Sequence, residues 1–185
     1  MNIDRNYLND LKEVVSAIPN IDKLYNTKLL ITGSTGMICS SVVEIVCYLN
    51  EVHGAKIKLY LAGRSKERIE NRFISLSEKF SFTFIPYDST KQHVIDCDID
   101  YIIHGAGDCS PDYYIPNPVE TIQNSIVGIQ PLLELSKKNK GSRILYISSS
   151  EVYGIRSGSE FRPFVENEYG IIDILNPRSS YPCGK

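Results

Sequence analysis

The feature that most restricts the fold is a glycine turn, GSTG at residues 33–36, between an apolar strand and a helix. KLLIT (28–32) precedes it as a buried strand, and MICSSVVEIVCYLN (37–50) follows at helical spacing. Glycine suits any tight turn, but after the first strand of a βαβ unit it favours a pyrophosphate held at the helix N-terminus. We therefore expect dinucleotide contacts from this segment: Gly33, Ser34, Thr35, Gly36, Met37 and Ile38.

One position departs from the usual dinucleotide-binding pattern. Cys39 stands where a third small residue normally lets the helix pack closely on the strand. Because cysteine is small and tolerates burial, we expect slightly wider packing and an intact site.

Beyond the turn, short apolar runs alternate with longer amphipathic ones. We predict strands at 56–62, 82–87, 100–106 and 143–149, with helices at 65–80, at 118–138 and near Tyr181, and a loop at 154–180. This alternation favours an α/β fold, a Rossmann-type doubly wound parallel sheet with flanking helices. Residues 3–17 also have helical spacing. Residues 1–27 are predicted as an N-terminal helical extension of a nucleotide-binding domain at 28–185.

Composition and charge argue against several other classes of protein. A net charge of −2 gives no reason to expect a nucleic-acid or anionic-membrane partner. No run approaches the roughly 20 apolar residues of a membrane span, and the N-terminus does not resemble a signal peptide. Five scattered cysteines without metal-type spacing predict free thiols, no metal site and a reducing, cytoplasmic location.

The end of the second strand bears on the choice between NAD and NADP. A carboxylate there would bind the ribose 2′-hydroxyl, whereas an arginine would accept a 2′-phosphate. In YLAGRS, Gly63 stands where the acid is expected and Arg64 follows. The missing acid favours NADP, although a solvated arginine is an equally simple interpretation, and NAD stays open.

Residues after the third and fourth strands are also candidates for the cofactor site. Asp88 is expected either at an adenine amino group or as a turn cap, and His104 as a structural histidine. The small residues of HGAG suit backbone packed against a cofactor: Gly105, Ala106 and Gly107.

A tyrosine and a lysine form the candidate catalytic pair. Tyr181 and Lys185 are four residues apart, so they share one helical face. Ser149 ends the fifth predicted strand, at the edge where doubly wound sheets bind ligands. An ammonium and an oxidised nicotinamide would lower the tyrosine pKa from about 10. Tyr181 could then take a proton from a secondary alcohol, held by Ser149, while hydride leaves its carbon.

TGSTGMIC, DYIIHGAG, SSSEVYG and YPCGK, in this order and spacing, resemble the NAD-dependent epimerase/dehydratase family of extended short-chain dehydrogenases/reductases. The resemblance covers residues 28–185 and implies bound NAD and a nucleotide sugar oxidised at C4 to a 4-keto intermediate. The family's catalytic residues fall on Ser149, Tyr181 and Lys185. Asn124 matches an asparagine that orders the active-site strands, and Ser148 is assigned to the cofactor.

Within the family, the dipeptide after the catalytic serine indicates the reaction. Dehydratases resembling this chain carry Asp-Glu there, whereas this chain has Ser150-Glu151, and serine is a poor acid for expelling a hydroxyl. Ser-Glu is similar to UDP-glucuronate decarboxylases, as are SPDYYIPNPVETIQNSIVG and ENEYGIIDILNPRSSYPCGK. This resemblance implies that Ser150, Glu151 and Arg178 contact the substrate, with Glu151 also catalytic. The alternative for Glu151 and Arg178 is a surface ion pair.

Other functions stay open at this point. A nucleotide-sugar 4-epimerase or 4,6-dehydratase is the alternative within the family, and a non-catalytic dinucleotide-binding module or an NADP-dependent carbonyl reductase lies outside it. Family members continue well beyond the tyrosine–lysine motif and commonly pair through helices near the active site. We therefore expect the protein to form a homodimer. We also expect this chain to be a fragment of a longer enzyme, with too little of the substrate domain to be active alone.

Overall fold

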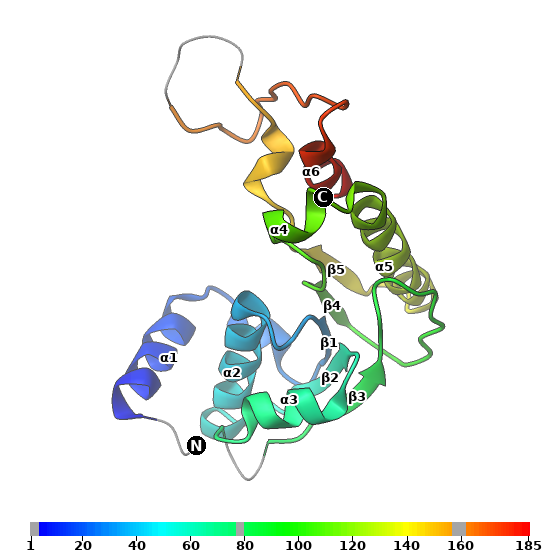
Figure 1. Ribbon diagram of the computed structural model, residues 1–185. Helices are drawn as coiled ribbons and strands as arrows, with labels where there is room; N and C mark the ends of the chain where they lie inside the picture. Colours follow the sequence, from blue (N-terminus) through cyan, green and yellow to red (C-terminus); the bar gives the residue numbers. More distant parts are fainter. Residues whose placement is uncertain (1–3, 77–79, 157–161) are drawn as a thin grey trace.

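A five-stranded parallel sheet forms the centre of the computed structural model, which describes residues 4–76, 80–156 and 162–185 (Figure 1). The strand order is β3-β2-β1-β4-β5. This order reverses beside β1, which confirms the predicted doubly wound Rossmann-type arrangement. The strands are β1 (Lys28–Thr32), β2 (Lys58–Gly63), β3 (Thr83–Pro86), β4 (Tyr101–His104) and β5 (Arg143–Tyr146).

Strand β1 shows how the sequence covers both faces of the sheet. Leu29 and Ile31 pack into one buried cluster with α2 (Met37–Val52) and α3 (Lys66–Phe73). Leu30, pointing the opposite way, packs into a second cluster with α5 (Pro118–Lys138). Because side chains alternate along a strand, an uninterrupted apolar run fills both cores.

The N-terminal segment forms α1 (Arg5–Ala17), which lies beside α2 (Figure 1). Leu11 and Val15 are buried in the first cluster, at the helical spacing that the sequence predicts. Asp4 caps the helix by accepting a hydrogen bond from the Asn6 N–H at 2.8 Å. The N-terminal extension therefore adds to the hydrophobic core between α2 and the sheet.

Several elements are shorter than the sequence predicts. The helix expected at 65–80 ends at Phe73 and continues as a turn over 74–76, and residues 77–79 lie outside the described part. Strands β3, β4 and β5 each end one to three residues early. At β4 the reason is local, because Ala106 turns its N–H toward the Thr32 hydroxyl at 3.1 Å.

The segments after β4 and β5 contain short helices that the sequence analysis did not predict. These are α4 (Pro111–Tyr114) and two 3-10 helices, η2 (Ser150–Tyr153) and η3 (Pro177–Ser179). The helix expected near Tyr181 is α6 (Ser180–Gly184). An isolated bridge joins Ile155 to Ile171 across the predicted loop, of which residues 157–161 lie outside the described part.

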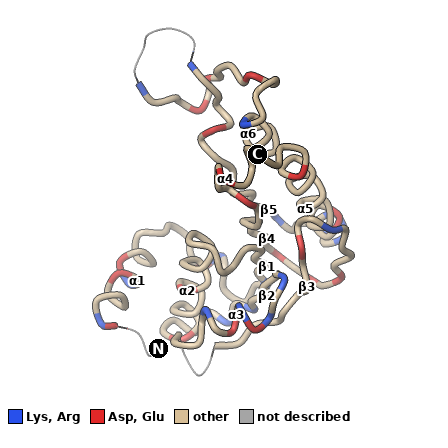
Figure 2. Tube along the Cα trace, viewed as in Figure 1, with Lys and Arg blue, Asp and Glu red and all other residues tan. Residues whose placement is uncertain are grey.

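Charged residues of both signs are interspersed over the helices and loops (Figure 2). Among the described residues, no helix combines the length and the apolar character needed to cross a membrane. All five cysteines are free thiols, as predicted.

Candidate active site

A cleft of about 360 Å³ opens where β1, β2, β3 and β4 end. It is built from the turns that follow these strands, because parallel strands end at one edge of the sheet. Its volume is in the range of ligand pockets. Nine of the predicted cofactor residues line it: Gly33, Ser34, Thr35, Gly36, Arg64, Asp88, Gly105, Ala106 and Gly107.

Gly33 is where the turns after β1 and β4 meet. Its φ is +68°, and a Cβ there would lie 2.7 Å from the Gly105 carbonyl atoms and 2.8 Å from the Ala106 nitrogen. Real Cβ atoms do not approach backbone this closely, so only glycine fits. Gly33, the first glycine of the predicted turn, therefore forms the base of the cleft.

Cys39 is accommodated by a glycine on the neighbouring turn. The cysteine is buried, and its Sγ lies 2.4 Å from where a Cβ on Gly105 would stand. The sulfur thus occupies the space that Gly105 leaves empty. The helix can still pack closely because the small residue that the pattern lacks at Cys39 on α2 is replaced by Gly105, which follows β4.

Ser34 offers an unsatisfied polar group inside the cleft. The residue is 1% exposed, and its Oγ has no hydrogen-bond partner within the described part of the chain. Buried hydroxyls are rarely left unpaired, so this atom fits a bound polar group. The bare N-terminus of α2, capped by Gly36 without a side-chain hydrogen bond, fits a pyrophosphate in the same cleft.

Met37 and Ile38 occupy the first turn of α2 but do not line the cleft. Their side chains are 86% and 55% exposed. A contact from either residue would therefore come from its backbone N–H.

A buried hydrogen-bond chain ties β1 to β4 below the cleft. Thr32 Oγ1 accepts from the Ala106 N–H and lies 2.7 Å from His104 Nδ1. Burial, together with the charge of Lys185, lowers the pKa of His104 to about 4. The imidazole is then neutral, and the threonine hydroxyl can donate to Nδ1. This placement fits the structural role expected of His104.

Lys185 reaches the cleft from the end of α6. Its Nζ donates to the Ile147 carbonyl at 3.1 Å and lies 5.8 Å from the ring centre of Tyr181. A Cβ built on Gly107 would lie 3.7 Å from this Nζ, so the ammonium borders the cleft. Burial lowers the pKa of Lys185. The Lys185 N–H bonds the Tyr181 carbonyl, which puts the two residues one helical turn apart.

Close packing of α6 on α5 positions this pair. A Cβ on Gly184 would lie 2.7 Å from Ser125 Oγ on α5. Asn124 lines a small recess beside Lys185, and this recess shares Ala106 and Gly107 with the main cleft. The predicted Asn124 and Lys185 are therefore brought together.

The serines at the end of β5 face this helix. Ser148 Oγ lies within hydrogen-bond distance of the Lys185 carbonyl, at 3.4 Å. Ser149 caps η2 by accepting from the Glu151 N–H at 3.2 Å, and η2 packs against α6. Ser150 is exposed.

Four side chains form a group that we call the tyrosine rim: Tyr114, Glu151, Arg178 and Tyr181. The Tyr114 and Tyr181 rings stack with centroids 4.7 Å apart and planes 10° apart. Arg178 donates to Glu151 Oε1 at 2.7 Å, and the Tyr114 hydroxyl lies 3.5 Å from the same oxygen. Burial and the Glu151 carboxylate raise the pKa of Tyr114.

Tyr114 was missed by sequence reasoning. It is buried in α4, a helix of four residues, which is too short for a periodic pattern to reveal. The signal that could have found it is its place in SPDYYIPNPVETIQNSIVG, the stretch that resembles UDP-glucuronate decarboxylases.

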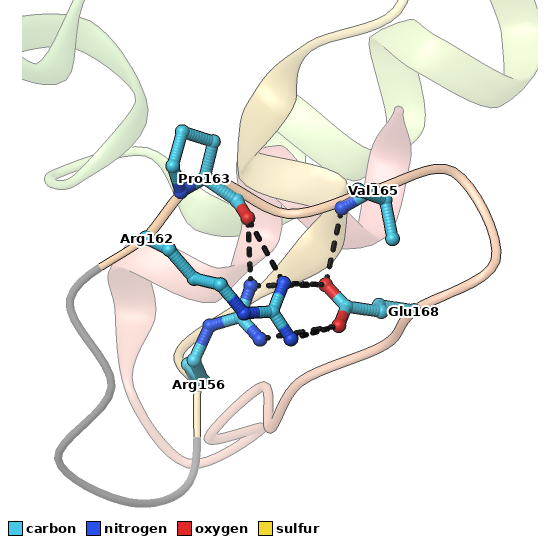
Figure 3. Close-up of polar contacts among 5 residues, drawn as sticks. All are labelled: Arg156, Arg162, Pro163, Val165 and Glu168. Carbon is cyan, nitrogen blue, oxygen red and sulfur yellow. Dashed lines mark hydrogen bonds and ion pairs between the residues drawn. The ribbon is translucent and has the colours of Figure 1, made fainter.

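A second polar cluster closes the segment after η2 (Figure 3). Glu168 accepts hydrogen bonds from Arg156 and Arg162, and both arginines also donate to the Pro163 carbonyl. Hydrogen bonds from Arg162 and Arg156 hold the pKa of Glu168 far below its usual range. We call this cluster the arginine clasp.

The arginine clasp is joined to η2 through aromatic rings. The Arg156 guanidinium lies 4.2 Å from the ring centre of Phe164, which stacks on Tyr153 at the end of η2.

Across residues 4–76, 80–156 and 162–185, no three His, Cys, Asp or Glu side chains are placed to hold a metal ion.

Comparison with known proteins identifies sequence relatives. The family model described as GDP-mannose 4,6 dehydratase matches residues 30–185. The chain is 33% identical over 160 residues to UDP-glucuronic acid decarboxylase 3 of Arabidopsis thaliana, covering 86% of this chain and 44% of that protein. It is 28% identical over 165 residues to UDP-glucuronic acid decarboxylase 1 of Danio rerio, covering 85% and 35%. The chain thus spans less than half the length of these relatives.

Solved structures share the fold. A UDP-glucose 4-epimerase from Bifidobacterium longum, in complex with NAD+ and UDP, superposes with a TM-score of 0.63 at 21% identity, over 85% of this chain and 47% of that one. The yeast methylglyoxal/isovaleraldehyde reductase Gre2, complexed with NADPH, gives 0.61 at 17% identity, over 85% and 49%.

Proposed function

Because the chain belongs to the family described as GDP-mannose 4,6 dehydratase, which matches residues 30–185, we propose that it is the cofactor-binding and catalytic part of a nucleotide-sugar enzyme. The enzyme oxidises the sugar C4 hydroxyl with bound NAD(P), and its activity is that of a UDP-glucuronate decarboxylase. The family match agrees with the resemblance inferred from the four motifs. The decarboxylase names of the sequence relatives support the choice of reaction.

The glycine cradle at Gly33, the orphaned Ser34 hydroxyl and the open N-terminus of α2 support NAD(P) as the bound group. Bound NAD(P) would supply the oxidant, by taking up a hydride from C4 of the sugar.

The tyrosine and lysine would carry the proton transfer. Tyr181 would remove the C4 hydroxyl proton as the C4 hydride departs, while the Lys185 ammonium favours the phenolate by its charge. Ser149 would hold the C4 oxygen by a hydrogen bond. The stack of Tyr114 on Tyr181 fixes the plane of the catalytic ring.

The observation that carries the decarboxylase proposal is the Arg178–Glu151 pair beside Tyr181. Oxidation at C4 makes the substrate a β-keto acid, whose C5–C6 bond breaks with its electrons moving into the C4 carbonyl. Arg178 would bind the C6 carboxylate by a charge-assisted hydrogen bond until carbon dioxide leaves. The resulting enolate would take a proton at C5, near Glu151, and the C4 alcohol would be restored by hydride from the reduced cofactor.

Incubation of the full-length protein with UDP-glucuronate and NAD+ tests this proposal. We expect carbon dioxide and a UDP-pentose, with no net reduction of the cofactor. The Tyr181→Phe variant should lose turnover but keep cofactor binding. Tyr169→Phe, which alters a tyrosine that is 92% exposed, is the matched control.

Other products would identify another reaction. A C4 epimer or a 4-keto-6-deoxy sugar without carbon dioxide would contradict decarboxylation and indicate the epimerase or dehydratase. Bound cofactor without turnover of any UDP- or GDP-hexose would support a non-catalytic module instead.

A further inference from the structure

We propose that Tyr146 is a positioning residue for Lys185, because it holds the lysine ammonium over the face of its ring. This inference rests on the catalytic pair of the proposed function. It assigns a role to a tyrosine at the end of β5 that the sequence analysis did not consider.

The first observation is the contact between the lysine and the ring. Lys185 Nζ lies over the Tyr146 ring, 5.1 Å from its centre, and 5.8 Å from the ring centre of Tyr181. Both distances are within the roughly 6 Å over which an aromatic face attracts a cation. Among the described residues, no carboxylate forms an ion pair with this ammonium. Two tyrosine rings and the Ile147 carbonyl are therefore the groups that hold its charge.

The second observation is a hydrogen bond that ties the same tyrosine to α6. The Tyr146 hydroxyl donates to the Gly184 carbonyl at 3.3 Å. Burial raises the pKa of Tyr146, so the hydroxyl stays protonated and remains a donor at neutral pH. The bond fixes the ring against the residue that precedes Lys185 in the chain.

The third observation concerns the side chain behind the ring. His104 on β4 is paired with Tyr146 on β5, and their ring centres lie 5.3 Å apart. Because burial lowers the pKa of His104 to about 4, the imidazole is neutral at neutral pH. A protonated histidine would repel Lys185. The neutral ring instead supports Tyr146 without opposing the ammonium.

A simpler alternative is that Tyr146 only fills space between β5 and the helices. Filling space needs bulk, whereas positioning a cation needs an aromatic face, so the two roles respond differently to replacement. Titratable side chains lie around Lys185 on β4, the segment after it, α4, β5 and α6: His104, Asp108, Cys109, Tyr113, Tyr146 and Tyr181. A replacement of Tyr146 leaves the other five in place.

Two replacements in the full-length protein separate the ring from the hydroxyl. Tyr146→Leu removes both, whereas Tyr146→Phe keeps the ring packed against His104. The measurement is the reactivity of Lys185 toward acetic anhydride in the cofactor-free protein, followed across pH by mass spectrometry of the peptide that contains it.

The sign of the expected change follows from the charge of the lysine. An aromatic face favours the ammonium, so loss of the ring should lower the pKa of Lys185. At neutral pH the fraction of free amine should then rise about twofold to fivefold in Tyr146→Leu. Tyr146→Phe should stay close to the wild type. Tyr101→Leu, the same replacement at the other end of β4, is the matched control and should also leave Lys185 unchanged.

Equal reactivity of Lys185 in the wild type and in Tyr146→Leu would overturn the proposal. Equal increases in Tyr146→Leu and Tyr146→Phe would overturn it too, because the effect would then follow the hydroxyl. If Tyr146→Leu does not fold, the wild type still decides. Ring currents should shift the Lys185 Hε protons upfield of their values in an unfolded chain, with Lys185→Met identifying the signals, and unshifted protons would contradict the contact.

These measurements use neither substrate nor cofactor, so they separate the two proposals. A protein whose Lys185 responds as expected but that turns over no nucleotide sugar would contradict the proposed function and support the positioning role.

Discussion

The nucleotide cleft and the tyrosine rim lie near the same edge of the sheet, but different kinds of contact hold them. At the cleft, backbone meets backbone: Gly33 lies close to the turn at Gly105, and the Gly105 N–H donates to the Thr32 carbonyl. At the rim, an ion pair and a ring stack join side chains from α4, η2, η3 and α6. Backbone contacts tolerate few substitutions, whereas side-chain pairs at a half-exposed surface can be exchanged. The cleft should therefore be the more sensitive region.

The largest effect is expected for Gly33→Ala. The new Cβ would meet backbone at 2.7 Å, and φ is in the left-handed region. We expect a loss of about 3 kcal/mol or more in unfolding free energy, together with loss of nucleotide binding. Urea denaturation and calorimetry measure both.

Gly54→Ala is the matched control for this variant. Gly54 has a similar φ of +63° but nothing within 4 Å of its Cβ position, so it should cost only about 1–2 kcal/mol. Equal costs at the two positions would show that the close approach at Gly33 is unimportant.

The second largest effect is a pH dependence of the unfolding free energy, caused by His104 beneath the cleft. The pKa of His104 falls from 6.5 to about 4 on folding, so the unfolded chain binds this proton at higher pH than the native state. Stability should therefore decrease as the pH drops from about 6.5 to 4, by about 3 kcal/mol from this group. Denaturation at several pH values should show this slope flattened in His104→Gln and retained in His53→Gln, which alters an exposed histidine.

An intermediate effect is expected where Cys39 fills the space beside Gly105. Gly105→Ala would place a Cβ 2.4 Å from Sγ and should cost about 1–3 kcal/mol. Adding Cys39→Ala should recover most of this loss, because the sulfur is then absent. A double-mutant cycle gives the coupling energy, and strictly additive losses would exclude the proposed contact.

The smallest effect on stability is expected at the tyrosine rim. Arg178→Ala breaks a half-exposed ion pair, so its unfolding free energy should change by less than about 1 kcal/mol. Turnover of UDP-glucuronate should nevertheless fall at least about tenfold, because the substrate carboxylate loses a charged donor. Arg143→Ala, at the start of β5, is the control for both measurements. If Arg178→Ala lost as much unfolding free energy as Gly33→Ala, the proposed difference between the cleft and the tyrosine rim would be contradicted.

The same contrast explains which features the sequence could predict. The fold and the composition of the cleft follow from local patterns, namely apolar periodicity and glycines after strands, and the fold prediction is confirmed. The stack of Tyr114 on Tyr181 depends on tertiary contacts that no spacing encodes. The end of α3 at Phe73 was also missed, because helical periodicity alone places boundaries poorly. The roles of the site residues stay predictions.

The arginine clasp has a consequence for how this chain would respond to denaturants. Arg156 and Arg162 are held to Glu168 by charge instead of a covalent bond. Guanidinium chloride supplies both screening salt and a chemical mimic of the two arginine side chains, so it competes directly for the Glu168 carboxylate. Urea is neutral and leaves that carboxylate to the arginines. The contacts of the arginine clasp should therefore break early in guanidinium but together with the remaining fold in urea, and the choice of denaturant would decide how many unfolding steps are seen.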